Sequence, residues 1–193
     1  MPDRYASFAE LARHERDGVD YAIVCEDRKS PVAVIAPHGG YIEPGTTEIA
    51  RAIAGDDLSV YSFIGLRPGR PHGDLHITSR LFDEPRCFAL LARSEVAVAI
   101  HGRADIDDPL LVYLGGLDTA LRDRLRETLT AAGFEARHDA QRYPGLHAMN
   151  VCNRGRSGRG VQLELPRSLR RHLTADPACL RLFSDSVRAA LPV

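Results

Sequence analysis

Short apolar segments alternate along the chain with segments whose apolar residues recur every three or four positions. Six short segments are rich in β-branched or aliphatic residues and predict strands, at residues 21–25, 32–36, 58–64, 95–100, 110–114 and 161–165. The second of these, VAVIA, has no polar alternation, as expected for a strand that is buried on both faces.

Helical periodicity separates several of these segments. It predicts helices at residues 46–54, 84–93 and 117–132, the last with a leucine at every fourth position, Leu117, Leu121, Leu125 and Leu129. A final helix is predicted to begin after Asp176, a good N-cap residue that is followed by Pro177. Because strands alternate with helices, the pattern predicts an α/β fold with helices on both faces of a sheet. Residues 66–74 and 153–160 are dense in Gly, Pro and Arg and predict surface loops.

Composition narrows the class of protein. A chain of 193 residues with 44% hydrophobic and 26% charged residues is predicted to form one domain over residues 1–193. It has no apolar run near the roughly 20 residues that cross a bilayer and no signal peptide, so we expect no membrane partner and a protein that is cytoplasmic as synthesised, with release by lysis left open. The net charge of −1 argues against non-specific nucleic-acid binding. The 4 cysteines form no CxxC pair, so a zinc site made of cysteines is not expected.

Two histidines stand at the carboxyl ends of predicted strands, where ligands gather in open α/β sheets. His38 and His101 are each followed by glycine, and Glu43 lies shortly after His38, beyond a Gly-Gly pair that allows a sharp turn. Two imidazoles and one carboxylate can hold zinc and leave a fourth position for water, as in catalytic sites. The alternative is that the histidines are ordinary strand-end residues and Glu43 is an acid favoured at a helix N-terminus.

A glutamate near the end of the last predicted strand is a candidate general base. In the segment VQLEL, Gln162 and Glu164 project from the face opposite to the three apolar residues. A buried glutamate is expensive unless it is paired or functional, and next to a metal it could move a proton. The alternative is an arginine-paired carboxylate on an edge strand, since six arginines lie nearby, Arg154, Arg156, Arg159, Arg167, Arg170 and Arg171. Such arginines either grip substrate carboxylates or form a solvated face.

Five segments together resemble one family. They are PHGGYIEPGTTEIA (37–50), LHITSRLFDEP (75–85), AIHG (99–102), MNVCNRG (149–155) and GVQLELPRSLR (160–170). In this order they closely resemble the poly-γ-glutamate hydrolases of bacteriophages and bacterial genomes. The resemblance implies a zinc carboxypeptidase-like fold, which is a three-layer αβα sandwich around an open, mixed and mostly parallel sheet.

The resemblance also implies a site and a reaction. One Zn²⁺ ion is expected on His38, Glu43 and His101, with Glu164 as the general base that helps a metal-activated water to cleave γ-glutamyl amide bonds. The LHITS segment is expected to bring His76, Thr78 and Ser79 near the cleft, where His76 would contact the substrate. The expected carboxylate-binding residues are Arg154 and Arg167, with Asn153 as a hydrogen-bonding partner, although Asn150 and Asn153 are equally well explained as turn residues.

The expected substrate is an anionic γ-glutamyl polymer or peptide, bound by a protein that is favoured to be a monomer. Because the chain is nearly neutral, a local positive patch has to attract such a substrate. Three alternatives stay open: a deacylase of small N-acyl amino acids, a cell-wall peptide amidase, and a non-catalytic phage-associated binding module.

Overall fold

Seven strands pair into one sheet in the computed structural model, which describes residues 2–192. Residues 1 and 193 of the predicted domain lie outside the described residues. The strands are β1 (Tyr21–Glu26), β2 (Val32–Gly40), β3 (Ser59–Gly65), β4 (Val96–Arg103), β5 (Val112–Gly115), β6 (Ala136–His138) and β7 (Val161–Pro166). The helices are α1 (Phe8–His14), α2 (Thr46–Ala54), α3 (Pro85–Leu91), α4 (Thr119–Ala131), α5 (Arg167–Ala175) and α6 (Pro177–Ala190), with 3₁₀ turns η1 (His72–Asp74) and η2 (Val151–Asn153).

The sheet is mixed and mostly parallel. Its strand order is β1-β3-β2-β4-β7-β5-β6, and β2 pairs in parallel with both β3 and β4. The pairs β4–β7 and β5–β6 are also parallel, while β1–β3 and β5–β7 are antiparallel. The predicted fold class is therefore confirmed.

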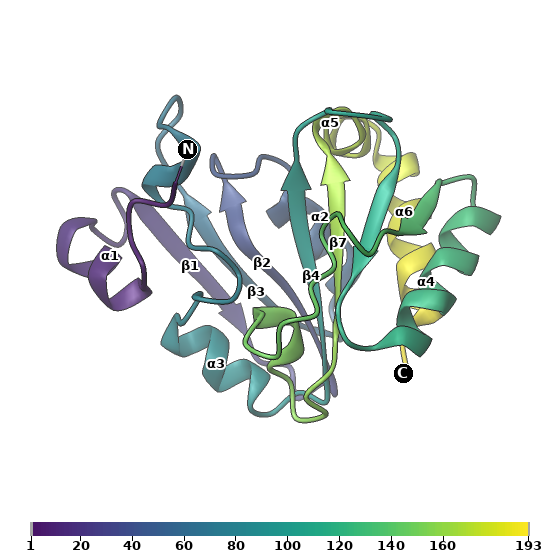
Figure 1. Cartoon of the computed structure of the whole chain (residues 1–193), viewed down its shortest axis with the longest axis horizontal. Helices are drawn as coiled ribbons and strands as arrows, with labels where there is room; N and C mark the ends of the chain where they lie inside the picture. The colour runs from purple at the N-terminus through teal and green to yellow at the C-terminus, as the bar shows by residue number, and fades with distance from the viewer. Residues whose placement is uncertain (1, 193) are drawn as a thin grey trace.

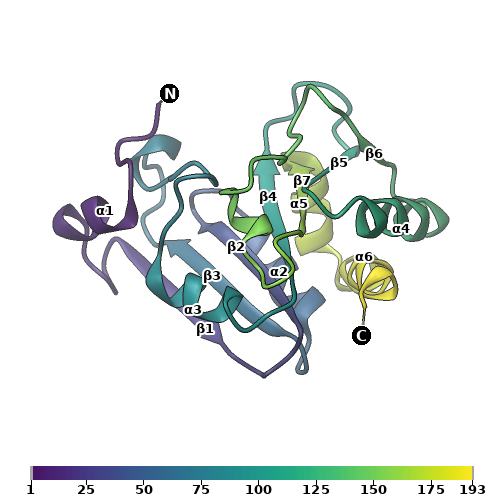
Figure 2. The same ribbon diagram turned by 60° about the horizontal axis from the view of Figure 1, so that its bottom comes forward.

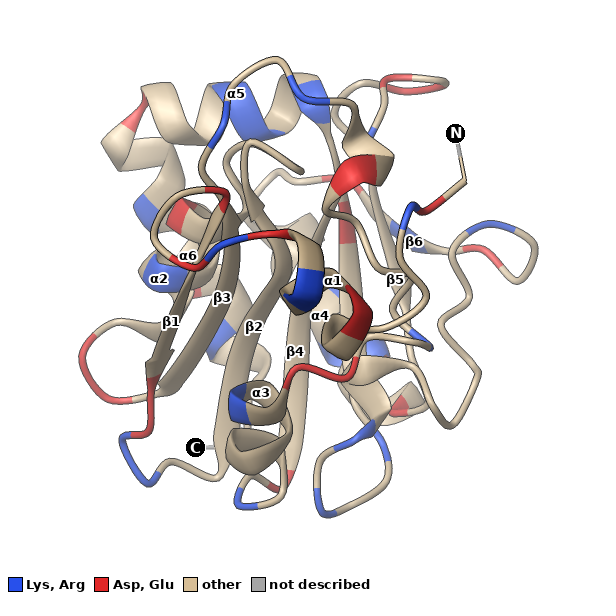
Figure 3. Ribbon diagram, turned by 90° about the vertical axis from the view of Figure 1, so that its left-hand side faces the viewer, with Lys and Arg blue, Asp and Glu red and all other residues tan. Residues whose placement is uncertain are grey.

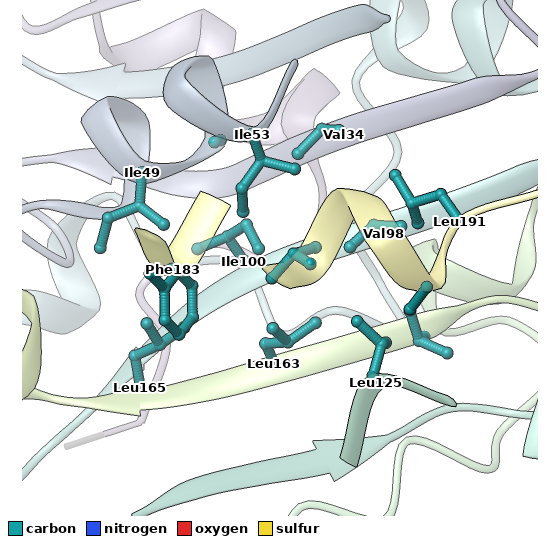
Figure 4. Packing of buried hydrophobic residues seen from close by; sticks show 14 of the residues in the cluster. Val34, Ile49, Ile53, Val98, Ile100, Leu125, Leu163, Leu165, Phe183 and Leu191 are labelled. Carbon is teal, nitrogen blue, oxygen red and sulfur yellow. The ribbon is translucent and has the colours of Figure 1, made fainter. Parts of the chain in front are cut away.

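Helices and irregular segments cover the two faces of this sheet (Figure 1). On one face, α2, α4, α5 and α6 pack on alternate strand residues such as Val34, Val98 and Leu163. Figure 4 shows Ile53 of α2 and Phe183 of α6 among these side chains. On the other face, α1, α3 and η2 pack on the intervening strand residues in a second buried cluster. The centre of the sheet is thus dry on both sides, as its apolar runs require.

One extra residue interrupts the regular pairing near the end of β2. The partner of Ala36 on β3 is Ser62, and the partner of Gly39 is Ile64. Between these two pairs the chain moves on by three residues in β2 but by only two in β3. This is a β-bulge at Pro37 and His38, and proline is tolerated at a bulge because it has no N–H to donate to the ladder.

The bulge changes the face from which His38 projects. Val34 and Ala36 point toward the helices α2 and α6, and strict alternation would send His38 the same way. Instead, the His38 ring lies on the opposite face, with ring centroids 5.0 Å from His101 and 6.2 Å from Phe82. The bulge therefore brings the two histidines together.

All six predicted strands and four predicted helices are present, but three further elements are not anticipated by the periodicity. These are α1, β6 and α5. The helix α5 follows β7 without a loop, and its buried face includes Arg170 beside Leu169 and Leu173, so its apolar stripe is interrupted by a charged residue. The predicted surface loop 153–160 is present from residue 154 onward and is exposed at residues 156–159, but Asn153, Gly155 and Gly160 are buried.

All four cysteines are free, with Cys87 and Cys152 buried and Cys25 and Cys179 half-buried. No helix within residues 2–192 is long and apolar enough to cross a membrane.

A buried carboxylate fastens the N-terminal segment to the loop before η1. Glu15 accepts hydrogen bonds from the Tyr5 hydroxyl at 2.8 Å and from the Arg70 guanidinium at 2.8 and 2.9 Å. Hydrogen bonding to Arg70 holds the pKa of Glu15 below its ordinary value, against the opposite effect of burial. Glu15 is therefore ionised in the folded protein at neutral pH.

Replacing this carboxylate is expected to weaken the fold in a pH-dependent way. Glu15→Gln should lower the free energy of unfolding at neutral pH by roughly 1–2 kcal/mol, because Arg70 loses its charged partner. Since the pKa of Glu15 is lower in the folded state, its contribution is complete above the unfolded pKa of about 4.3 and is lost as the pH falls toward the folded pKa. Urea unfolding at several pH values measures this, with Glu127→Gln on the exposed face of α4 as control. Identical pH slopes for wild type and Glu15→Gln would contradict the assignment.

Candidate active site

Three side chains meet where β2 and β4 end. The Nδ1 atoms of His38 and His101 are 3.2 Å apart. Glu43 Oε1 lies 3.3 Å from His38 Nδ1, and Glu43 Oε2 lies 3.8 Å from His101 Nδ1. All three residues are buried. Two imidazole nitrogens and a carboxylate thus face one another in a space that is shielded from bulk water.

A tight turn brings Glu43 back to His38. The Glu43 N–H donates to the His38 carbonyl at 2.9 Å, and Gly40 takes the left-handed φ of 62° that favours glycine. Gly39 is needed for a different reason, because a Cβ there would lie 2.1 Å from Thr47 Oγ1. The Gly-Gly pair therefore permits both the turn and its close packing on α2.

Each member of the cluster is oriented by a second contact. His38 Nε2 lies 2.9 Å from the Ile77 carbonyl, to which it donates, and His101 Nε2 lies 3.3 Å from Ser79 Oγ. Glu43 Oε2 accepts the Gly102 N–H at 2.7 Å. Such contacts fix the ring orientation and direct the Nδ1 atoms of both histidines toward the carboxylate.

The spacing of these atoms fits a tetrahedral zinc ion. Ligand atoms at about 2.0–2.2 Å from zinc lie roughly 3.3–3.6 Å from one another. The two Nδ1 atoms are 3.2 Å apart, while Glu43 Oε1 lies 3.3 Å from His38 Nδ1 and its other oxygen, Oε2, lies 3.8 Å from His101 Nδ1. Two histidines and a glutamate are ligands of catalytic zinc sites, which keep one position open. These residues can therefore hold such an ion with only small adjustments.

His76 lies close enough to compete with His101 as a ligand. The ligand atoms of His38, Glu43 and His76 fall within 4.8 Å of one another, and the His76 ring centroid is 3.9 Å from that of His38. The two rings are tilted by 35° to each other. We favour His101 as the third ligand because its Nδ1 lies 3.2 Å from His38 Nδ1 and 3.8 Å from Glu43 Oε2.

Burial and charge set the protonation of this cluster. Burial alone would raise the pKa of Glu43, but the nearby His38 holds that pKa well below its ordinary value. Burial lowers the pKa of His101 to about 3. Burial also lowers the pKa of His76, to about 4, and the nearby His38 adds to this effect. The pKa of His38 is raised, because Glu43 outweighs the effect of burial. A cation and a proton therefore compete for His38, whereas the other groups are already in their metal-binding forms.

Glu164 lies beside His101 on the next strand. The parallel register of β4 and β7 sets His101 opposite Glu164, so both side chains project from the same face. Burial, with Glu43 adding to the effect, raises the pKa of Glu164 to about 8. A bound cation nearby would lower that pKa again. The alternative of a carboxylate on an edge strand is wrong, because β7 lies between β4 and β5.

A chain of amide hydrogen bonds leads from Glu164 to the loop before η2. Gln162 Nε2 donates to Glu164 Oε1 at 3.2 Å and to the Tyr143 carbonyl at 3.2 Å. Gln162 Oε1 accepts from Asn150 Nδ2 at 2.9 Å, which fixes the orientation of the Gln162 amide. Tyr143 has a left-handed φ of 54°, an unusual conformation for a bulky residue. Gln162 therefore orients one oxygen of Glu164.

A cleft of about 730 Å³ opens over the cluster and over Glu164. Four arginines line it, Arg80, Arg103, Arg167 and Arg170. Arg103 pairs with Asp107 at 2.7 Å, and Arg170 donates to main-chain carbonyls at 3.1 and 3.2 Å. Arg80 and Arg167 are exposed and make no ion pair within residues 2–192. These two guanidinium groups are available to bind an anion.

Two residues predicted to contact substrate do not line the cleft. The Arg154 guanidinium stacks on the Phe88 ring at 4.5 Å. Asn153 is buried, and its Nδ2 donates to the carbonyls of Gly145 at 2.8 Å and His147 at 3.0 Å. The assignment of Arg154 and Asn153 as substrate contacts is therefore corrected, because packing and loop hydrogen bonds occupy both side chains. Arg167 and His76 do line the cleft.

Several residues of the site are not singled out by the sequence. Gln162 has a usable signal, since it lies two residues before Glu164 and projects from the same face. Arg80 also has one, since it directly follows the LHITS segment, whereas Tyr143 has none because only the tertiary fold brings it to the site. Thr78 and Ser79 lie near the cleft as expected from the LHITS segment.

The fold and the cluster define an α/β protein with a His–Glu–His site of metal-binding type at the carboxyl edge of a mixed sheet. Within this class, the chain belongs to the poly-γ-glutamate hydrolase family, whose model matches residues 5–182. The predicted family is therefore confirmed.

Known relatives agree with this membership. A solved bacteriophage poly-γ-glutamate hydrolase matches with 31% identity and a TM-score of 0.91 over 97% of this chain and 96% of that one. A solved zinc-free apo form of YndL matches with 32% identity and a TM-score of 0.87 over the same shares. The prophage-derived protein YoqZ of Bacillus subtilis is 38% identical over 174 residues, or 89% of this chain. The chain spans 61% of the length of YoqZ.

The packing of Gly39 can be tested directly. A Cβ at this position would meet Thr47 Oγ1 at 2.1 Å and Ser62 Oγ at 2.5 Å. Gly39→Ala is therefore expected to lower the free energy of unfolding by roughly 1–3 kcal/mol or more, as in other overpacked sites. Urea denaturation measures the change, with Glu127→Ala on the exposed face of α4 as control. If Gly39→Ala proves no less stable than Glu127→Ala, the turn does not depend on this close packing.

Proposed function

We propose that this chain is a zinc-dependent hydrolase that cleaves γ-glutamyl amide bonds of poly-γ-glutamate or related γ-linked peptides. The observation that carries the proposal is the convergence of His38, Glu43 and His101 beside the buried carboxylate of Glu164. Family membership supports the bond that is cleaved, and the zinc-free apo form of the relative YndL supports the metal. The spacing of the three side chains is suited to one ion.

Zinc bound by these residues would lower the pKa of a water molecule and polarise the amide carbonyl. Glu164 is the general base: its carboxylate accepts a proton from the attacking water and delivers it to the leaving nitrogen. Gln162 holds Glu164 Oε1, which leaves Oε2 for the proton. The Ile77 carbonyl and the Ser79 hydroxyl keep the two histidine rings in place during this exchange.

Two arginines are suited to the carboxylates of the substrate. Each residue of a γ-linked glutamate polymer keeps a free α-carboxylate, and a guanidinium group can bind one through two hydrogen bonds. Arg167 begins α5, where the positive end of the helix dipole adds to its charge. Arg80 is the second arginine, in place of the predicted Arg154, and His76 also lines the cleft. Figure 3 shows further basic residues along α5, a local positive patch on a protein of net charge −1.

Two predictions from the sequence accompany this proposal. The enzyme acts as a monomer, and it is made in the cytoplasm and reaches an external polymer after lysis. Sedimentation of the purified protein and assay of the culture medium before and after lysis test them separately.

Metal content and product size test the proposed function. Purified wild type is expected to hold about one zinc per chain and to shorten poly-γ-glutamate. His101→Ala should lose the metal, whereas Glu164→Gln should keep it and lower kcat by roughly 10²–10⁴-fold. Metal analysis and gel filtration of the products measure these effects, with His172→Ala on the exposed side of α5 as control.

Full polymer cleavage after exhaustive chelation, or by Glu164→Gln, would overturn the proposal. Cleavage of small N-acyl amino acids with no effect on the polymer would assign the deacylase instead.

The support that Gln162 gives to Glu164 makes a separate prediction. Gln162→Leu is expected to keep zinc and to lower kcat by roughly 10–100-fold, because one Glu164 oxygen loses its donor. Steady-state kinetics beside metal analysis measure this, with the exposed Gln141→Leu as control. An unchanged kcat would show that Glu164 needs no such support.

A further inference from the structure

The N-terminal segment reaches the active site through one carboxylate. Asp3 Oδ1 lies 2.6 Å from His76 Nδ1, and Asp3 Oδ2 accepts the Thr78 N–H at 2.7 Å. The segment also packs against η1, where the Arg4 N–H donates to the Gly73 carbonyl at 2.8 Å. Figures 1 and 2 show the start of the chain beside this turn. Both oxygens of Asp3 are therefore directed into residues 76–78.

Residues 76–79 touch both histidines of the metal-type cluster. The His76 ring packs against His38 with centroids 3.9 Å apart, and the Ile77 carbonyl accepts from His38 Nε2 at 2.9 Å. Ser79 Oγ lies 3.3 Å from His101 Nε2. This short segment has no regular helix or strand of its own to hold it. Its position therefore depends on contacts such as those of Asp3.

Asp3 also decides which nitrogen of His76 is free. An ionised carboxylate can only accept hydrogen bonds. In the hydrogen bond with Asp3, His76 Nδ1 is therefore protonated and is the donor. The unprotonated Nε2 is then the atom of His76 that is available as an acceptor, on a side chain that lines the cleft. The contact therefore fixes both the tautomer and the orientation of the His76 ring, whose centroid lies 3.9 Å from that of His38.

We propose that Asp3 is a positioning residue of the active site, which acts through His76 and Thr78 to hold residues 76–79 against the two metal-binding histidines. This inference rests on the proposed function, because it assumes that His38 and His101 bind the catalytic metal. According to this proposal, the N-terminal segment supports catalysis by holding residues 76–79 in place, although no residue of that segment touches the reacting atoms.

Asp83 provides a matched control. Its Oδ1 accepts the Phe8 N–H at 2.5 Å, so it also fastens the N-terminal segment to the region after η1. Within residues 2–192, no hydrogen bond or ion pair joins the Asp83 side chain to His76 or to residues 77–79. Replacing either aspartate loosens the same segment, but only Asp3 acts on the histidines.

The experiment compares Asp3→Asn, Asp3→Ala and Asp83→Ala with the wild type. Zinc affinity by chelator competition, kcat and KM on poly-γ-glutamate, and urea stability are measured for each. Asp3→Ala is expected to lose roughly 10–100-fold in zinc affinity or in kcat, with a smaller loss in Asp3→Asn, which keeps one acceptor oxygen. Asp83→Ala should lose stability but leave zinc affinity and kcat within about twofold of the wild type.

A spectroscopic readout makes the result independent of activity. In ¹H–¹⁵N spectra of the wild type, the His76 ring should carry its proton on Nδ1, and this signal should shift or disappear in Asp3→Asn. The proposal is overturned if His76 is protonated on Nε2 in the wild type, or if Asp3→Ala and Asp83→Ala have the same zinc affinity and kcat. Wild type that neither binds zinc nor cleaves polymer would instead refute the proposed function, and the spectrum would still decide the Asp3–His76 contact.

Discussion

The bulge at Pro37 and His38 determines where the functional side chains of this protein meet. Strict alternation along β2 would bury His38 against the helices on the far face, away from His101. The extra residue turns His38 to the face of His101 and Glu164, while the residues before it keep their place in the core. A local irregularity thus supplies the geometry of the site, and the regular sheet on either side supplies its rigidity.

Everything else at the site is arranged around that meeting point. The turn through Gly40 brings Glu43 close to His38. The Gly102 N–H, at the end of β4, donates a hydrogen bond to the Glu43 carboxylate. Strand β7 adds Glu164 at the same level, and Gln162 holds it. Residues 76–79 close the cluster from outside the sheet, and Asp3 and Glu15 fasten the N-terminal segment beside them. Segments far apart in the sequence therefore converge on two strand ends.

Much of the fold and part of the site could be predicted from the sequence, because the spacing of apolar residues indicates which side chains are buried. Six of the seven strands in the described residues, four helices and the strand-end positions of His38 and His101 follow from it directly. The periodicity did not predict α5, since Arg170 occupies a buried position on its apolar stripe. Arg154 appeared as one of six arginines in a basic stretch, and only the fold separates it, stacked on Phe88, from Arg167 at the cleft. The contact of Asp3 with His76 spans 73 residues and leaves no local pattern.

The central claim is that His38, Glu43 and His101 together hold one catalytic zinc ion. Anomalous diffraction at the zinc edge, from crystals grown with zinc, tests it most directly. The account predicts one peak in the cleft within about 2.2 Å of His38 Nδ1, a Glu43 oxygen and His101 Nδ1, with one position left for water. A peak bound by His76 in place of His101, or no peak at these side chains, would contradict it.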